Sequence, residues 1–257
     1  MSSKANFYLD ILKGIWYSIG MKRLLYILVL MFLASTLVFA KTFRPRQLRI
    51  AVIDTGLNLT DPRFQDHLCK TGHKDFTGEG IKDLVDHGTH VVGIIQQNAG
   101  NANYCLLIYK FYSFAVSGKL NQEREVMALK QAIKDKADIV NISGGGESKY
   151  NPEKEVIKHN PRTLFVVAAG NDHHDLDLKC DYYPACLGFN NILVIGSLNS
   201  EGVRSNFSNY GSVVSTYEIG EDVLSTLPDN REGRMSGTSM ATAVYTGKLI
   251  RKMLNAE

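Results

Sequence analysis

Gly237-Thr238-Ser239-Met240-Ala241-Thr242, near the C-terminal end of the 257-residue sequence, decides how the rest of the chain is interpreted. A small-residue turn that holds a serine is common by itself. Three further motifs precede it in a fixed order: Val52-Ile53-Asp54-Thr55-Gly56, Asp86-His87-Gly88-Thr89-His90 and Ala168-Ala169-Gly170-Asn171. Together the four motifs offer an acid, a base, an amide donor and a nucleophile, which are the groups that acyl transfer requires.

This combination resembles the subtilisin-like serine peptidases, whose catalytic residues follow one another along the chain as Asp, His and Ser. The resemblance covers roughly residues 47–250 and includes Asn206-Phe207-Ser208-Asn209-Tyr210-Gly211. It implies an α/β fold of three layers, in which helices cover both faces of a parallel β-sheet. It also implies peptide or protein substrates and a mechanism without a cofactor.

The pattern of apolar residues independently predicts an α/β fold. Short β-branched runs alternate with amphipathic helical stretches from Gln47 onward, as in a parallel sheet covered by helices. Asn121 is the expected N-cap of one helix. The predicted strands are 48–53, 105–111, 138–142, 163–168 and 192–195, and the predicted helices are 87–97, 121–136, 152–159 and one that begins at Ser239.

Asp54 and His87 are the expected acid and base of a catalytic triad. Asp54 ends the first predicted strand, where functional groups of open parallel sheets gather, and the resemblance gives it the role of orienting the His87 imidazole. Aspartic peptidases also use Asp-Thr-Gly, but they need a second such motif, which this sequence lacks. His87 and His90 do not have the i, i+4 spacing of a zinc helix, so His90 is interpreted as structural.

Ser239 is the expected nucleophile, and Asn171 is the expected side-chain donor to the oxyanion. A serine at the start of a helix has a free backbone N–H that can point at an oxyanion. Taken alone, Ser239 could be a simple N-cap and Asn171 a turn residue. The presence of Asp54 and His87 favours the catalytic interpretation.

Residues 141–146 have the character of a strand edge that pairs with an extended substrate. The expected substrate contacts are Ser143, Gly144, Gly145, Ala168 and Gly170. Members of the family usually carry a larger residue where Gly144 stands, so we expect a wide and weakly selective groove.

No metal site is predicted. The loop Asp172-His173-His174-Asp175-Leu176-Asp177 is rich in metal-ligand types, but a solvated polar loop is the favoured interpretation. The calcium loop of many relatives is not recognisable in Gln96-Gln97-Asn98-Ala99-Gly100-Asn101.

Residues 1–40 form the expected leader and residues 41–257 the expected peptidase domain. An uncharged apolar run over 24–40 follows Lys22-Arg23 and ends in Val38-Phe39-Ala40, as in a secretory signal peptide cleaved before Lys41. The alternative is an uncleaved anchor that attaches the chain to a membrane through residues 24–40. Either way, the peptidase domain is expected outside the cytoplasm, secreted or periplasmic in the first case.

The formal net charge of +3 lies entirely in this leader. Nothing in the remainder therefore favours a nucleic acid partner. The four cysteines Cys69, Cys105, Cys180 and Cys186 follow the leader. Four cysteines allow three pairings. The short loop between Cys180 and Cys186 favours that bridge, with Cys69–Cys105 as the second, and buried free thiols are the alternative.

Three features depart from the family pattern. The residues after the serine motif read Thr242-Ala243-Val244-Tyr245-Thr246-Gly247, where the family usually has Thr-Pro-His-Val-Ala-Gly. The sequence is C-terminally short for the family, and little chain separates the leader from the first strand. The leading hypothesis is an exported serine endopeptidase, and the alternative is a catalytically degenerate relative that binds extended peptides at the cell envelope. A lipase or esterase is disfavoured because no Gly-x-Ser-x-Gly motif occurs.

Overall fold

Tyr26 and residues 46–255 are the part of the chain that the computed structural model describes. Apart from Tyr26, the predicted leader over residues 1–40 lies outside this part. Within the described residues, no helix has both the length and the apolar character needed to cross a bilayer.

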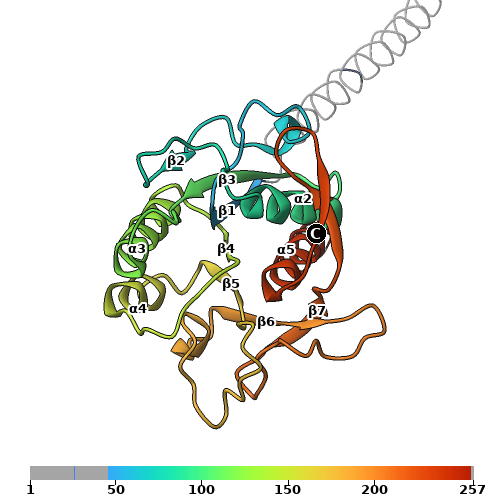
Figure 1. The fold of residues 1–257 in the computed structure, drawn as a ribbon. Coiled ribbons are helices and arrows are strands. Elements are labelled where there is room, and N and C mark those ends of the chain that lie inside the picture. The colour runs from blue at the N-terminus through green and yellow to red at the C-terminus, as the bar shows by residue number, and fades with distance from the viewer. Residues whose placement is uncertain (1–25, 27–45, 256–257) are drawn as a thin grey trace, which may run out of the picture. The chain divides into compact units, whose positions relative to one another are not determined.

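A parallel sheet of seven strands lies at the centre of the fold (Figure 1), in the order β2-β3-β1-β4-β5-β6-β7. All five predicted strands are present, because their apolar runs are buried on both faces of the sheet. The two edge strands were not predicted, since β2 is very short and β7 is only partly buried. The strands are β1 (Leu48–Asp54), β2 (Lys74–Asp75), β3 (Tyr104–Lys110), β4 (Ile139–Ile142), β5 (Leu164–Ala168), β6 (Ile192–Leu198) and β7 (Thr216–Ile219).

Helices cover both faces of this sheet, so the predicted three-layer α/β fold is confirmed (Figure 1). Because side chains alternate along a strand, Ile50 and Val52 of β1 face one layer while Ala51 and Ile53 face the other. The first layer contains α2 (His87–Ala99) and α5 (Thr238–Asn255), and the second contains α3 (Gly118–Lys134) and α4 (Asn151–Lys158). Short 3₁₀ turns lie at Gln65–His67 and Ala185–Leu187.

The predicted start of α3 was wrong by about one turn. Ser117 is the N-cap, and its side chain accepts a hydrogen bond from the Leu120 N–H at 3.4 Å. Asn121 lies inside the helix, where its side chain bonds both backbone groups of Ser113. The local sequence favours Asn as a cap, but the two hydrogen bonds to Ser113, eight residues earlier, give the buried Asn121 side chain a different partner.

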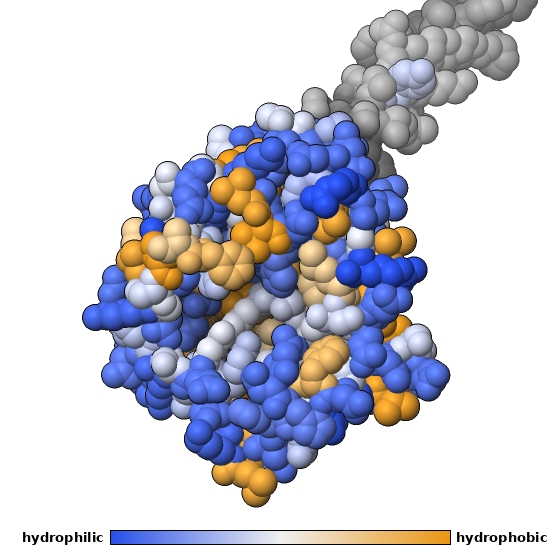
Figure 2. Space-filling model, viewed as in Figure 1, coloured by the Kyte–Doolittle hydropathy of each residue, from blue (hydrophilic) through white to orange (hydrophobic). Residues whose placement is uncertain are grey.

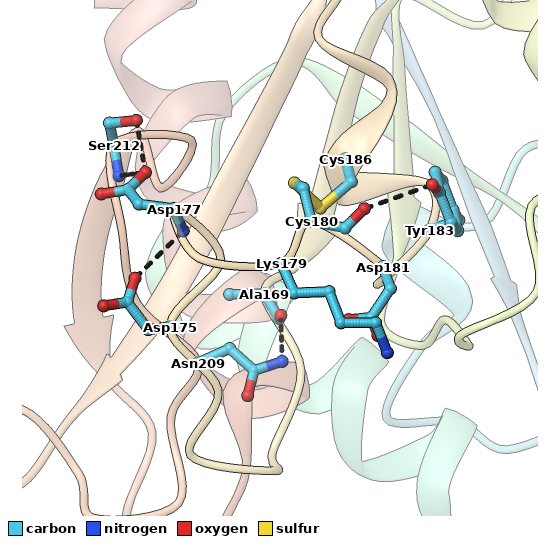
Figure 3. The surroundings of a disulfide bond; sticks show 10 residues. All are labelled: Ala169, Asp175, Asp177, Lys179, Cys180, Asp181, Tyr183, Cys186, Asn209 and Ser212. Atoms are coloured by element: carbon cyan, nitrogen blue, oxygen red, sulfur yellow. Dashed lines mark hydrogen bonds and ion pairs between the residues drawn. A yellow bond between two sulfur atoms is a disulfide. The ribbon is translucent and has the colours of Figure 1, made fainter.

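Both predicted disulfides are present. Cys69–Cys105 ties the chain before β2 to β3, and Cys180–Cys186 closes a short loop. Figure 3 shows the second bridge beside Tyr183, whose hydroxyl donates to the Cys180 carbonyl at 3.3 Å. In the polar loop that precedes it, the Asp177 carboxylate accepts hydrogen bonds from the Ser212 backbone N–H and hydroxyl, so this acidic side chain serves loop structure.

The sheet topology brings the functional motifs together at the carboxyl ends of the parallel strands. Asp54 ends β1 beside Lys110 of β3, and Ile53 pairs with Ile142, which Ser143 follows. The next strand, β5, leads into Gly170 and Asn171. The antiparallel hairpin β8–β9 (Val223–Thr226 and Glu232–Met235) then leads into the N-terminus of α5. The carboxyl ends of neighbouring parallel strands therefore place the sequence motifs together.

Candidate active site

Asp54 and His87, the predicted acid and base, form a direct hydrogen bond. The His87 Nδ1 lies 2.7 Å from Oδ1 of Asp54, which is only 5% exposed. The Thr55 N–H also donates to the same carboxylate oxygen at 2.7 Å and fixes its position. Because an ionised carboxylate only accepts hydrogen bonds, the proton belongs on Nδ1 of His87, and Nε2 is left as the basic nitrogen.

Asp83 holds the start of α2 in place, and the sequence analysis missed it. Its carboxylate accepts hydrogen bonds from the Thr89 N–H at 2.8 Å and the Thr89 hydroxyl at 2.7 Å. It also accepts from the Thr55 hydroxyl at 2.9 Å, which in turn accepts from the Gly88 N–H. This buried network joins both residues that follow His87 to the residue after Asp54. The sequence offered one indication of this role, which is that Asp83 lies four residues before His87. Spacing alone does not reveal which backbone N–H groups a carboxylate caps.

The environment of His87 sets the pH at which it can accept a proton. Burial alone lowers the pKa of His87, but the Asp54 charge and hydrogen bond, with the Asp83 charge, outweigh it, so the pKa lies above 6.5. A general base must be neutral, so kcat/KM should fall toward acid with a midpoint above pH 6.5. A profile from pH 5 to 9 on a peptide anilide checks this. A midpoint below 6.5 would mean that burial dominates.

Ser239 lies in the first turn of α5 and contacts the end of β4. Its Oγ donates a hydrogen bond to the Ser143 carbonyl at 2.7 Å, and the Ser143 hydroxyl donates to the Ser239 carbonyl at 3.1 Å. Since a hydroxyl carries a single proton, Ser239 in this rotamer does not donate to His87. A catalytic hydrogen bond that is absent or long without substrate is common in enzymes.

Asn171 is held by Thr238, a second residue that sequence reasoning missed. The Asn171 Oδ1 accepts from the Thr238 N–H at 2.8 Å and from its hydroxyl at 2.9 Å. The Thr238 Oγ1 also accepts a hydrogen bond from the Gly170 N–H at 3.2 Å. Because both bonds use Oδ1, they fix the amide with its Nδ2 donor left for another partner. The neighbouring Ser239 N–H belongs to the first turn of a helix, where backbone donors lack intrahelical partners.

A cavity of about 680 Å³ runs away from Asp54 and His87 along the residues that follow β4. Ser143, Gly144 and Gly145, three of the predicted substrate contacts, line it. A Cβ on Gly144 would meet no atom within 4 Å, so the expected free space beside this residue is present. In the view of Figure 2, the surface of the molecule is hollowed near its centre, and apolar side chains lie on the rim beside α3.

The other two predicted substrate contacts lie outside the wall of this cavity. Ala168 is buried in β5. Gly170 has a positive φ of 101°, and a Cβ there would come within 2.2 Å of Asn209 Nδ2. This close approach requires glycine. The Asn209 amide donates to the Ala169 carbonyl at 2.9 Å, so Asn209 supports the turn that carries Asn171.

A family model described as the subtilase family matches residues 46–252. The chain belongs to the subtilase family. It is 32% identical over 228 residues to the major intracellular serine protease of Bacillus subtilis (strain 168), covering 82% of this chain and 70% of that protein. It is also 32% identical over 232 residues to an intracellular serine protease of Paenibacillus polymyxa, covering 83% of this chain and 69% of that protein.

Solved structures agree with this assignment. The crystal structure of a cold-adapted subtilisin-like serine proteinase matches 81% of this chain and 76% of its own, with a TM-score of 0.68 and 27% identity. The fold and the family are therefore those that the sequence motifs indicated, and the chain is a subtilisin-like serine endopeptidase.

Proposed function

We propose that this subtilase hydrolyses peptide bonds with a triad formed by Asp54, His87 and Ser239. The observation that carries the proposal is the 2.7 Å hydrogen bond between the buried Asp54 carboxylate and His87 Nδ1. It leaves Nε2 of His87 as a base at one end of a cavity that Ser143 also lines. The hydrogen bond from Ser239 to Ser143 supports the assignment of the nucleophile, because it keeps Ser239 beside that cavity.

Substrate binding is expected to release Ser239. An extended peptide that pairs with the Ser143–Gly145 edge offers its own N–H groups to this edge. A peptide N–H on the Ser143 carbonyl would replace the Ser239 hydroxyl there, and Ser239 would rotate to His87. Nε2 of His87 then takes the hydroxyl proton as Oγ attacks the scissile carbonyl.

The tetrahedral intermediate carries a negative charge on its oxygen. The Asn171 Nδ2 and the Ser239 N–H are the proposed donors to it, since Thr238 holds the other end of the Asn171 amide. The imidazolium of His87, stabilised by Asp54, gives its proton to the leaving amine. Water, activated by the same imidazole, hydrolyses the acyl-enzyme and restores Ser239.

A fluorophosphonate probe tests this proposal, because it reacts only with an activated serine. Labelling of the wild-type chain, and no labelling of Ser239→Ala or of heat-denatured protein, is the expected result. Labelling of neither protein, with both folded by circular dichroism, would remove the catalytic triad and leave the peptide-binding alternative.

We propose further that the peptidase domain, residues 41–257, is exported and that residues 1–40 are a cleaved signal peptide or, alternatively, a membrane anchor. The apolar run over 24–40 and the two disulfides support this, since disulfides persist in oxidising compartments. The named relatives include intracellular proteases, so the compartment needs its own test.

N-terminal sequencing of the protein recovered from its native host is that test. A mature N-terminus at Lys41, in the secreted or periplasmic fraction, is expected from cleavage, and a retained leader in the membrane fraction from an anchor. A cytosolic chain with an intact leader and four thiols open to alkylation would contradict export.

A further inference from the structure

Two glutamates, one buried and one half-buried, line the cavity described above, on helices that the proposed catalytic steps do not use. Glu125 of α3 and Glu153 of α4 both line it, together with His87 and residues 143–148. Glu153 is 5% exposed, and its Oε1 is buried without a hydrogen-bond partner among the described residues. The Oε1 of Glu125 is likewise a buried atom without a hydrogen-bond partner among the described residues. A buried polar atom without a partner is costly, and a ligand with hydrogen-bond donors that enters the cavity would give both Oε1 atoms a partner.

The electrostatics of this pair favour a cation. Burial raises the pKa of Glu125, and burial with the nearby charge of Glu125 raises the pKa of Glu153. Two such groups ionise more readily when a positive charge arrives between them. Lys119 also lines the cavity but is exposed, and no ion pair among the described residues joins it to either carboxyl. Within the described residues no ion pair joins either carboxyl to a cation, which leaves both open to a positively charged ligand.

The walls of the cavity distinguish a side-chain cation from a metal ion. Phe111, Tyr112, Phe114, Val116 and Tyr183 line the space that Glu125 and Glu153 share with His87. Such a wall suits the methylene stem of lysine or arginine, whose charged end would reach the carboxyls. A metal ion would need more ligands, and the described residues contain no group of three or more His, Cys, Asp or Glu side chains that could hold one.

The pair lines the same cavity as the edge that is proposed to bind the substrate. Ser143 contacts Ser239, and the chain then runs through Gly144–Ser148 along the cavity wall toward α4. A peptide extended along this wall advances about 3.3 Å per residue away from the reacting carbonyl. Within the described residues, neither glutamate makes a hydrogen bond or ion pair with Asp54, His87 or Ser239, so neither is assigned a role in the catalytic steps.

We propose that Glu125 and Glu153 form a specificity site for a lysine or arginine side chain located two to four residues before the scissile bond. This inference rests on the proposed function, because it takes the cavity as the substrate groove. It replaces the expectation of a weakly selective groove. The space beside Gly144 admits a side chain, and the carboxyl pair selects its charge.

Equilibrium binding to the full chain carrying Ser239→Ala tests the site without requiring catalysis. The probes are fluorescein-labelled hexapeptides with either lysine or norleucine at the second, third or fourth residue before the scissile position. Norleucine keeps the stem and removes the ammonium group. Lysine is expected to bind roughly 10- to 100-fold more tightly at one of these positions, as for a hydrogen bond to a charged group.

Glu125→Gln and Glu153→Gln, made singly in the same background, should each reduce this ratio at least threefold and leave norleucine binding unchanged. Glu155→Gln is the matched control, because Glu155 lies on the same helix and is 54% exposed beside His159. Thermal unfolding establishes that each variant is folded. Both glutamine variants keep the side-chain volume, and a variant that fails to fold leaves the other as the test.

Equal binding of lysine and norleucine at all three positions would overturn the proposal, as would a ratio unchanged in both glutamine variants. A calcium titration tests the alternative that the two glutamates bind a metal ion. Glutamate-dependent binding of Ca²⁺ that abolishes the lysine preference would assign the pair to a metal and overturn the proposal. Failure of the fluorophosphonate test affects only the catalytic assignment, since peptide binding is measured here in the absence of Ser239.

Discussion

Asp54→Asn should lower kcat by about 10⁴-fold, the size of effect found when the triad aspartate of a serine peptidase is made asparagine. The structural reason is the direction of one hydrogen bond. The Asp54 carboxylate accepts a proton from Nδ1 of His87 at 2.7 Å and thereby leaves Nε2 free of hydrogen. An asparagine amide can donate to Nδ1 instead, which puts the imidazole proton on Nε2, where it can no longer accept the serine proton.

The same substitution removes the main positive contribution to the pKa of His87. The acid limb of kcat/KM should therefore move to lower pH as the rate falls. Both quantities come from one series of rate measurements between pH 5 and 10. A fall in kcat of less than tenfold, in a variant that unfolds at the wild-type temperature, would show that Asp54 is not the orienting acid.

Asp86→Asn is the matched control for this prediction. Asp86 directly precedes His87, carries the same charge and pairs with Arg231 on the surface. It has a left-handed φ of 72°, which asparagine tolerates well. Its replacement should change kcat by less than about threefold, since exposed ion pairs contribute little.

Asn171→Ala should lower kcat by 10²- to 10³-fold and change KM by less than about threefold. This magnitude is the one found when the side-chain oxyanion donor is removed from a subtilisin. The reason is that the Asn171 amide, held by Thr238 through Oδ1, is proposed to bond the oxygen only after it becomes an oxyanion. An interaction made only in the transition state affects kcat rather than KM.

Steady-state kinetics on a peptide anilide measure this separation of kcat from KM. Asp172→Ala is the control, because Asp172 is the next residue and its side chain is exposed. It should retain at least half of the wild-type kcat. An Asn171→Ala variant that loses affinity for substrate but keeps its kcat would assign Asn171 to ground-state binding instead.

The sequence by itself determined the family, the three-layer fold and the residues proposed for the triad. These follow from short-range patterns. Buried parallel strands have continuous apolar runs, as in β1, and the glycine-containing motifs around Asp54, His87 and Ser239 each carry their own local signature. Both disulfides were predicted as well, because Cys180 and Cys186 are close in sequence and leave a single partner for Cys69.

Tertiary structure decided what depends on partners far apart in the chain. The rotamer of Ser239 is set by the Ser143 carbonyl, 96 residues earlier, and the amide of Asn171 by Thr238, 67 residues later. The sequence analysis did not single out Glu125 or Glu153, because no local motif surrounds either residue. The packing of α3 and α4 beside one cavity brings both residues to its wall and buries the Oε1 atom of each. The periodicity of a sequence indicates which face of a helix is apolar. It does not indicate how two helices pack, and this packing decides which groups lie next to a polar side chain.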